Sequence, residues 1–179
     1  KVLFPLKAAR QLSKILHGEG EIGIGIEENS IFFQTSNFSF TSQLIDAKFP
    51  DYKGVIPKEY KIVFEATREN LIDAIRRVSL LSDQQTRLVR FNVKEDFLIL
   101  SSASSDFGSA QEKLPIVLKG EKTPMEIGFN AVYLLEGLRA IEGEKVEIRL
   151  IGEESPAVFS SKTSVNYLYL LMPVKLRED

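Results

Sequence analysis

The sequence predicts an α+β protein assembled from one structural unit, a strand followed by a helix and three more strands, that is repeated three times. The first observation behind this prediction is that Phe4, Phe64 and Phe129 each end a short strand-like segment and precede a helical one. The second is that three stretches of alternating apolar residues, separated by polar turns, follow each helical segment. A pattern that returns roughly every 60 residues indicates a duplicated architecture.

In the first unit, the helix is predicted to begin at Pro5, because a proline in the first helical turn loses no hydrogen bond. One face of this helix is apolar, and Gly18 with Gly20 ends it. The three strands that follow are predicted over residues 22–26, 31–33 and 38–40.

The helices of the second and third units are predicted to start at Thr67 and Asn130, whose side chains can accept hydrogen bonds from free backbone N–H groups. Each helix again carries an apolar face, and Gly143 ends the third. The strands after these helices are predicted over residues 89–93, 97–100, 146–150, 157–159 and 167–171.

Pairing of units predicts the domain organisation, because one unit is too small to be stable alone and two can bury both helices against joined sheets. Residues 49–59 contain Pro50, Gly54 and Pro57 and are expected to form an interdomain linker. We expect residues 1–57 to be half of one domain, and residues 58–179 to be a complete domain with repeats 61–120 and 121–176. The unpaired first unit is expected to join the same unit of another copy.

Composition excludes several classes of function. The chain has 25 acidic and 23 basic residues, no cysteine and a single histidine, so thiolate and histidine metal sites are not expected. No apolar run is long enough for a membrane span, and no catalytic motif or cofactor fingerprint stands in its required context. We expect no enzymatic activity, no cofactor and no metal. The chain begins with Lys1 and is expected to be a piece of a longer protein or a processed form.

Basic residues are spaced along the outer faces of the helices. Lys7, Arg10 and Lys14 form a stripe at i, i+3 and i+7 on the first helix, and the second helix carries Arg68, Arg76 and Arg77. The third helix offers only Arg139. Two interpretations stay open: an ordinary solvated face, or contact with the phosphate backbone of a nucleic acid.

The C-terminal stretch alternates over Tyr167, Tyr169 and Leu171, which predicts a strand, and the leucines between them suggest that both of its faces are covered. Pro173 ends the strand, and a short apolar tail follows. This stretch is either a terminal strand of the core or the edge of a groove that receives an apolar partner.

Three motifs carry a resemblance to a known family. They are Phe49-Pro50-Asp51-Tyr52 with Val55-Ile56-Pro57, then Phe129-Asn130 with Tyr133, then the stretch from Tyr169 that ends in Met172-Pro173-Val174-Lys175-Leu176. With these motifs the whole chain resembles the bacterial sliding clamp, the beta subunit of DNA polymerase III. The resemblance implies the DNA-clamp fold, with antiparallel sheets outside and helices lining one face. It also implies that the family's first domain and half of its second are absent from this chain.

The resemblance further implies a DNA sliding clamp without catalytic activity, which encircles duplex DNA as part of a dimeric ring in the cytoplasm, at the nucleoid. Its partners would be duplex DNA and, through short peptide motifs, DNA polymerase, the clamp loader and repair proteins. The residues implied to form the peptide groove are Pro50, Val55, Asn130, Tyr133, Leu170, Leu171, Met172, Pro173, Val174 and Leu176. The DNA-facing residues would be Lys7, Arg10, Lys14, Arg68, Arg76, Arg77 and Arg139. Leu80 and Leu81 would contact the neighbouring subunit; the alternative is ordinary core after a helix, since an apolar pair at a helix end often staples the turn.

Two other function classes remain as alternatives. A stand-alone peptide-binding scaffold would use the same groove and would need no basic stripes. An enzyme would need a polar pocket that these residues do not supply.

Overall fold

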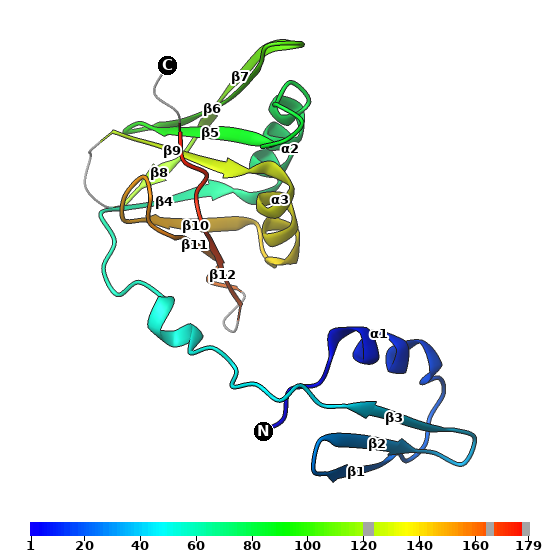
Figure 1. Cartoon of the computed structure of the whole chain (residues 1–179). Helices are drawn as coiled ribbons and strands as arrows, with labels where there is room; N and C mark the ends of the chain where they lie inside the picture. The colour runs from blue at the N-terminus through cyan, green and yellow to red at the C-terminus, as the bar shows by residue number, and fades with distance from the viewer. Residues whose placement is uncertain (120–123, 164–166, 177–179) are drawn as a thin grey trace. The chain divides into compact units, whose positions relative to one another are not determined.

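The computed structural model describes residues 1–119, 124–163 and 167–176, and it divides the chain into two compact units, Lys1–Lys53 and Gly54–Asp179 (Figure 1). The larger unit contains two helices and two antiparallel sheets, and the smaller contains one helix and one sheet. No helix among the described residues is long and apolar enough to cross a membrane.

The larger unit has a five-stranded sheet in the order β12-β11-β10-β4-β8 and a four-stranded sheet in the order β7-β6-β5-β9. The strands of the first sheet are β4 (Ile62–Thr67), β8 (Val117–Leu118), β10 (Lys145–Leu150), β11 (Ala157–Ser160) and β12 (Leu168–Leu171). Those of the second are β5 (Leu88–Val93), β6 (Phe97–Ser104), β7 (Gly108–Pro115) and β9 (Met125–Asn130).

The two repeats of this unit exchange their opening strands. β4 opens the second repeat but pairs with β10 of the third, with Phe64 opposite Ile148. β9 opens the third repeat but pairs with β5 of the second, with Phe129 opposite Val89. Each sheet therefore contains strands from both repeats, so neither repeat can complete its sheet without the other.

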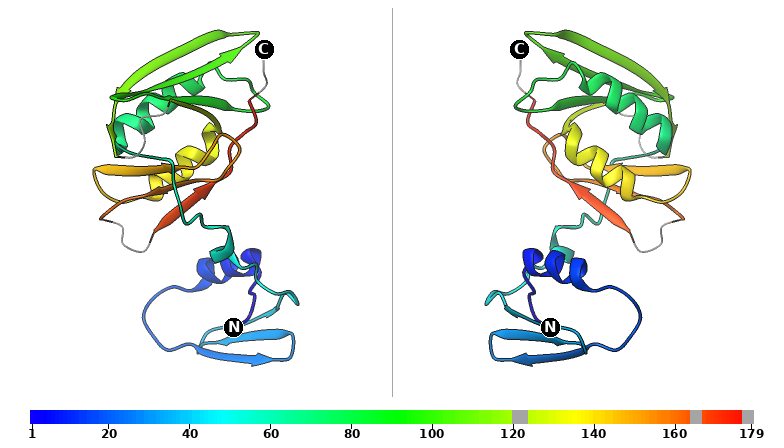
Figure 2. Two further views of the ribbon diagram at one scale, coloured as in Figure 1. Left: turned by 90° about the vertical axis from the view of Figure 1, so that its left-hand side faces the viewer. Right: turned by 90° about the vertical axis from the view of Figure 1, so that its right-hand side faces the viewer.

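Two helices, α2 (Arg68–Ser79) and α3 (Ala131–Ala140), lie next to each other on one side of the two sheets (Figures 1 and 2). Their apolar faces and the inner faces of both sheets form one continuous core. Phe91, Phe129 and Phe159 cross this core in edge-to-face contacts, with ring centroids 5.2 and 5.8 Å apart.

Helix starts agree with the prediction in one case and differ in the other. The side chain of Asn130 accepts a hydrogen bond from the backbone N–H of Val132, as predicted for a helix cap. Thr67 stands at the corresponding position before α2, but its side chain makes no capping hydrogen bond, so that part of the prediction is wrong. The backbone carries the connection instead, since the N–H of Arg68 donates to the carbonyl of Glu144.

The smaller unit contains α1 (Leu6–Ile15) and the three-stranded antiparallel sheet of β1 (Gly23–Glu27), β2 (Ser30–Gln34) and β3 (Ser39–Gln43). Its core is small, with Leu12 of α1 against Ile31 and Phe33 of β2. The strand predicted to end at Phe4 does not form. The smaller unit contains no strand of a second repeat with which residues 2–4 could pair. This segment instead accepts one backbone hydrogen bond, from the N–H of Ile45 to the carbonyl of Leu3.

The segment predicted to link the domains contains a short 3₁₀ helix, η1 (Tyr52–Val55), and the boundary between the two units lies within it. The C-terminal strand β12 is shorter than predicted and lies at the edge of its sheet. Leu168 is exposed because it points to the face of the sheet opposite to that of Tyr169 and Leu171, which pack on the core, so the expectation that both faces are covered is wrong. Residues 164–166 and 177–179 lie outside the described part of the chain.

Candidate functional site

The apolar tail after β12 runs back along β9 of the larger unit. The backbone N–H of Val174 donates a hydrogen bond of 2.8 Å to the carbonyl of Gly128 in β9. The side chain of Leu176 then packs over that glycine: a Cβ atom added at Gly128 would lie 2.6 Å from Cδ2 of Leu176 and 2.7 Å from Cδ1 of Leu88. Gly128 is thus the position at which the sheet makes room for the tail.

Tyrosines of the C-terminal stretch fix the same region to α3. The Tyr169 hydroxyl donates to the backbone carbonyl of Tyr133 at 2.9 Å, and its ring lies so close to Gly137 that an added Cβ would be 2.2 Å away. The Tyr167 hydroxyl reaches the carbonyl of Gly137 at 3.5 Å. Burial raises the pKa of both phenols, which therefore stay protonated and able to donate at neutral pH.

Asn130 holds the beginning of α3 in place with both ends of its side-chain amide. The oxygen accepts the capping bond from Val132 at 2.9 Å, and the nitrogen donates to the carbonyl of Thr86, also at 2.9 Å. This predicted groove residue therefore has a structural role, because it joins the helix to the loop before β5.

Exposed apolar side chains surround this anchored tail. Tyr133 is 55% exposed, Met172 57% and Val132 48%, while Leu170, Pro173, Val174 and Leu176 are half-buried. Leu171 is buried in the core. The larger unit thus presents an apolar strip, which we define as Val132, Tyr133, Met172, Val174 and Leu176, beside β9 and at the beginning of α3.

The other two predicted groove residues lie in the linker segment. Val55 is the last residue of η1, in the larger unit, and its side chain is exposed. Pro50 belongs to the smaller unit, where it lines a hollow of about 1030 Å³ together with Phe49, Tyr52 and the segment Lys1 to Leu3.

The sequence did not identify Val132 as part of the apolar strip, nor Leu88 as a residue that packs beside Gly128 beneath it. It also missed Gly128 and Gly137, whose absent side chains leave the space that Leu176 and Tyr169 occupy. A glycine inside a strand or a helix is a signal of close approach, and it could have been used here.

The predicted DNA-facing cations fall into three groups. Lys7, Arg10 and Lys14 on α1 and Arg139 on α3 are exposed, and none forms an ion pair with a described residue. Arg76 pairs with Asp73 at 3.1 Å on its own helix. Arg77 and Arg68 are engaged with other elements.

Arg77 makes a two-pronged contact with Glu112 of β7, in which its Nε donates to Oε2 at 3.0 Å. The hydrogen bond from Arg77 lowers the pKa of Glu112, and Glu112 raises the pKa of Arg77. Arg68 crosses instead to the end of α3, where its Nε donates to the Gly143 carbonyl at 3.0 Å and its Nη1 to the Leu138 carbonyl at 3.5 Å. Arg68 therefore caps a neighbouring helix.

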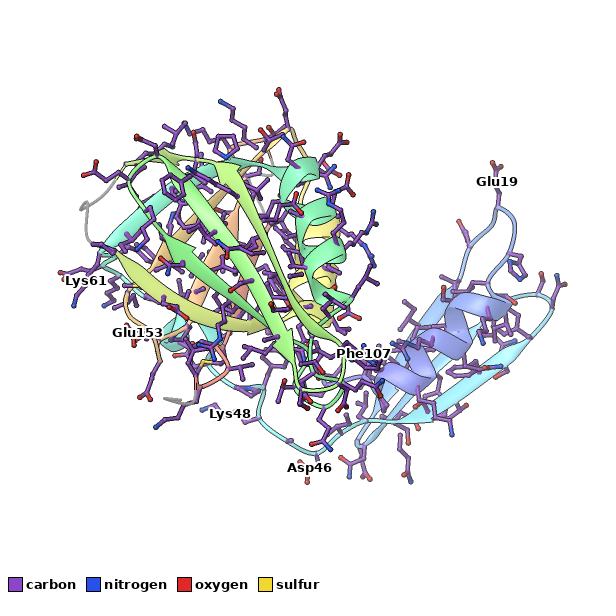
Figure 3. All side chains as sticks on the ribbon, turned by 90° about the horizontal axis from the view of Figure 1, so that it is seen from above. Glu19, Asp46, Lys48, Lys61, Phe107 and Glu153 are labelled. Atoms are coloured by element: carbon purple, nitrogen blue, oxygen red, sulfur yellow. The ribbon has the colours of Figure 1, made fainter. Side chains whose placement is uncertain are left out.

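Apolar side chains also lie away from the strip. Leu80, directly after α2, is 78% exposed, whereas Leu81 is half-buried. Phe107 is exposed in the turn between β6 and β7 (Figure 3). Leu80 and Phe107 are thus exposed apolar side chains of the larger unit outside the strip.

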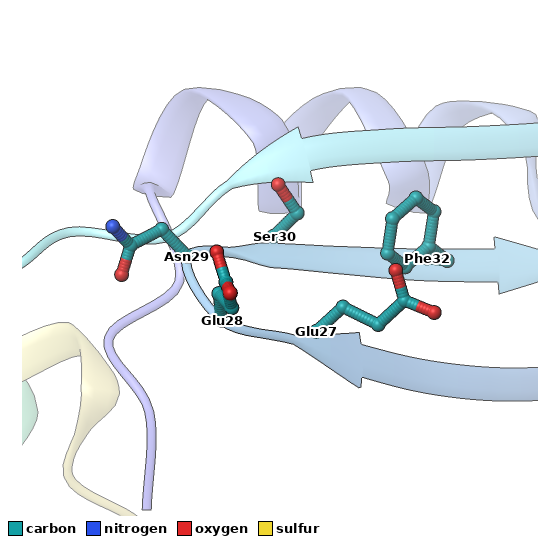
Figure 4. Close-up of a pocket in the computed structure, with 5 residues that line it drawn as sticks. All are labelled: Glu27, Glu28, Asn29, Ser30 and Phe32. Carbon is teal, nitrogen blue, oxygen red and sulfur yellow. The ribbon is translucent and has the colours of Figure 1, made fainter.

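Acidic residues gather at the turn between β1 and β2. Glu27 and Glu28 line a hollow of about 500 Å³ with Asn29, Ser30 and Phe32, and their carboxylates leave the chain in different directions (Figure 4). Among the described residues, no group of three or more potential metal ligands is close enough to hold an ion.

Comparison with known proteins matches both units of the chain to one protein family. Residues 53–175 match the DNA polymerase III beta subunit, C-terminal domain, and residues 1–51 match the central domain of that subunit. Beta sliding clamps of Synechococcus elongatus and Salmonella typhimurium are 33% and 35% identical over 98% of this chain. The chain spans 48% of the length of each of these curated relatives.

Solved structures agree with the sequence relatives. The DNA polymerase sliding clamp of Pseudomonas aeruginosa, solved with a ligand, superposes with a TM-score of 0.85 at 31% identity, over 98% of this chain and 48% of that one. The beta subunit of Thermotoga maritima gives a TM-score of 0.86 at 27% identity, with the same coverage. The predicted α+β clamp architecture is confirmed, and this chain belongs to the DNA polymerase III beta subunit family, the bacterial sliding clamps.

Proposed function

We propose that this chain provides the peptide-binding part of a DNA sliding clamp. In this proposal the apolar strip receives short linear motifs from DNA polymerase, the clamp loader and repair proteins, and thereby tethers them to DNA. The observation that carries the proposal is the strip itself, in which exposed Tyr133 and Met172 flank a tail that is hydrogen-bonded to β9. An adaptable methionine beside an aromatic anchor suits a surface that accepts several partners.

A peptide titration tests this part of the proposal. A fluorescent peptide of the Gln-Leu-x-Leu-Phe type is added to the chain and to the Tyr133→Ala variant, and anisotropy is measured. Tyr133 contributes its backbone carbonyl to the bond from Tyr169, so loss of its ring leaves that bond in place. We expect the affinity to fall by about tenfold or more, as for a central aromatic anchor.

Glu136→Ala is the matched control, because Glu136 is an exposed residue of the same helix outside the strip. Its affinity should equal that of the unsubstituted chain. If Tyr133→Ala binds as well as this control, the strip is not the binding site. A chain shortened to end at Leu171 should also lose affinity, and unchanged binding would contradict the role of the tail.

We further propose that the family's ring, when complete, encircles duplex DNA and that the helices of this chain face the duplex. The exposed cations Lys7, Arg10, Lys14 and Arg139, which form no ion pair within the described part of the chain, support weak contact with phosphates. The apolar residues at the end of α2, Leu80 and Leu81, would contact the neighbouring subunit. Such a protein works in the cytoplasm, at the nucleoid, and performs no catalysis itself.

Salt dependence tests the DNA contact. Replacing Lys7, Arg10 and Lys14 by alanine should reduce the slope of log K against log salt by up to about 0.9 for each phosphate that is no longer neutralised. The Glu112→Gln variant should do the opposite, because it releases Arg77 from its partner on β7. An unchanged slope in both variants would contradict a role of these helices in DNA binding.

A stand-alone peptide-binding scaffold is the second candidate function. The observation that favours it is the internal engagement of Arg68, Arg76 and Arg77, which leaves Arg139 as the only predicted DNA-facing cation of the larger unit with no ion pair or cap among the described residues. This candidate predicts peptide binding with no measurable affinity for duplex DNA at any salt concentration.

A further inference from the structure

A row of side chains crosses the outer face of the five-stranded sheet and ends at the C-terminal stretch. Arg149 of β10 lies directly opposite Val158 of β11, and Val158 lies directly opposite Leu170 of β12. Residues that are directly opposite in antiparallel strands point to the same face of the sheet. That face is the one away from the core, because Ala157 and Phe159 belong to the core cluster and Val158 between them does not. We define Arg149, Val158 and Leu170 as the outer row.

The outer row is covered, although it lies away from the core. Val158 is completely buried and Leu170 is half-buried. A segment that is not part of the core must therefore lie over this face. The ring of Tyr60, just before β4, has its centroid 5.6 Å from the guanidinium carbon of Arg149. The cover thus includes the end of the linker segment, residues 55–60, which we define as the linker end.

Burial within the linker end shows that one side of it packs against the protein. Ile56, Pro57 and Tyr60 are half-buried, whereas Lys58 and Glu59 between them are exposed. The Tyr60 hydroxyl donates to the backbone carbonyl of Pro57 at 2.9 Å, which closes this segment into a turn. The linker end is therefore a shaped part of the larger unit and differs from a freely solvated connection.

Arg149 is held in place from the side of the sheet. Its Nε donates to Oε1 of Glu147 at 2.8 Å, and Glu147 also accepts a hydrogen bond of 2.9 Å from Lys119. The side chain of Arg149 is 31% exposed, so its contact with the ring of Tyr60 is partly removed from water. A cation over an aromatic ring attracts it more strongly when the pair is desolvated. Arg149 is thus a fixed anchor for the linker end.

We infer that Tyr60 and Arg149 are positioning residues of the peptide site, which hold the linker end on the outer row and keep Val55 on the face to which Leu170 points. Neither residue touches the peptide, and both act through Val55, which is 58% exposed. The inference rests on the proposed function, because Val55 and Leu170 are groove residues only in that proposal. It assigns one wall of the groove to the linker end of the larger unit.

The dimensions of the sheet allow this arrangement. Neighbouring strands lie about 4.8 Å apart, so Leu170, two strands from Arg149, lies on the order of 10 Å from it. The chain from Val55 to Tyr60 can span up to about 17 Å when it is extended. Val55 can therefore reach the end of the outer row while Tyr60 stays on Arg149.

A spin label at position 55 tests the positioning directly. The chain contains no cysteine, so Val55→Cys takes a single nitroxide label. We expect the lines of its spectrum to narrow when Tyr60→Ala or Arg149→Ala is added, because the released linker end moves faster. Tyr60→Phe keeps the ring over Arg149, and the matched control Glu59→Ala changes only an exposed neighbour, so neither should alter the spectrum.

The peptide titration tests whether this positioning serves binding. Tyr60→Ala should lower the affinity about threefold to tenfold, and Tyr60→Phe should bind within about twofold of the unsubstituted chain. In a Val55→Ala background, Tyr60→Ala should cost less than about twofold further, because a residue that acts only through Val55 is coupled to it. Urea unfolding checks that each variant is folded at the temperature of the titration.

Three results would overturn the inference. Unchanged label mobility in Tyr60→Ala and Arg149→Ala would show that these residues do not hold the linker end. An unchanged affinity of Tyr60→Ala would show that the linker end is no part of the site. An equal loss of affinity with Val55 and with Val55→Ala would assign Tyr60 a general role in stability.

Failure of the proposed function looks different from each of these results. In that case the unsubstituted chain binds no peptide, or Tyr133→Ala binds as well as Glu136→Ala. The label at position 55 needs no peptide, so its spectrum still decides whether Tyr60 and Arg149 hold the linker end.

Discussion

Arg68 lies on a helix predicted to face DNA, yet its guanidinium is used inside the protein. It donates to two carbonyls at the end of α3, and its side chain is 22% exposed. We expect Arg68→Ala to lower the free energy of unfolding by about 1–2 kcal/mol, because carbonyl groups at the end of α3 lose a charged donor. Urea unfolding followed by circular dichroism measures this loss.

Arg76→Ala is the control for this prediction, since Arg76 is exposed and pairs only with Asp73 on its own helix. Its effect should stay within about 0.5 kcal/mol. Equal effects of the two substitutions would show that the cap on α3 contributes nothing to stability.

The substitution Gly137→Ala distinguishes packing from helix propensity, because the two effects predict opposite changes in stability. Alanine normally stabilises a helix interior relative to glycine by about 1 kcal/mol. At Gly137 the new Cβ would lie 2.2 Å from the Tyr169 ring, so the ring must move. We expect Gly137→Ala to destabilise the protein by about 1–3 kcal/mol and to weaken peptide binding. Thermal unfolding and the peptide titration measure both effects, and a stabilised variant would refute the close packing.

Residue patterns pointed to the stretch that forms the apolar strip and said little of how its residues are used. Tyr133 and Met172 belong to the strip and Asn130 caps the helix that carries Tyr133, while their role in a peptide groove stays a prediction. The sequence did not reveal that Arg68 and Arg77 are bound to α3 and β7, because their partners lie 70 or more and 35 positions away. Contacts of that kind depend on the tertiary arrangement, which periodicity does not report.

At the scale of elements, period and spacing predicted the helices and most strands, because their apolar residues alternate with polar ones at the period of a helix or a strand. Which strands pair with each other could not be predicted from the sequence. The exchange of β4 and β9 between repeats depends on which edge lies nearby in space, and the apolar pattern of a strand is the same for either neighbour. The same reason explains the wrong prediction of a strand ending at Phe4, whose pattern is correct but whose neighbouring edge is absent from its unit.

An ionic network joins three elements on the outside of the five-stranded sheet. The ammonium group of Lys119, directly after β8, contacts Glu65 of β4 and lies 2.9 Å from Glu147 of β10. The hydrogen bond from Lys119 lowers the pKa of Glu65 below its ordinary value of 4.5, and Glu65 raises the pKa of Lys119 above 10.5. The network therefore stabilises the fold at pH values between about 4.5 and 10.5, where both groups are charged.

The sign of the pH dependence follows from linkage. A carboxylate with a lowered pKa stabilises the fold above pH 4.5, and this contribution disappears as the pH falls through its folded-state pKa. We expect Glu65→Gln to cost less stability at low pH than at pH 7, which flattens the acid limb of the stability curve. Urea unfolding at several pH values tests this, and parallel curves for the two proteins would contradict it.

At the scale of the whole molecule, the two units differ greatly in their cores. Three residues form the buried core of the smaller unit, whereas the larger has a continuous core from two helices and two sheets. We expect backbone amides of β1, β2 and β3 to exchange with solvent faster than those of β5, β9 and β10, since local stability follows buried apolar contact. Hydrogen exchange with mass spectrometry measures the difference. Equal protection of both units would refute the proposed difference in stability.

The exchange of opening strands makes the two halves of the larger unit obligate partners. A chain cut between Lys119 and Pro124 would yield two pieces, each holding the strand that the other lacks. Such pieces are suited to associate without a covalent link, because each supplies a strand to the sheet of the other, as in a split-protein complementation assay. The architecture that duplicated one module thus also supplies a ready-made complementation pair.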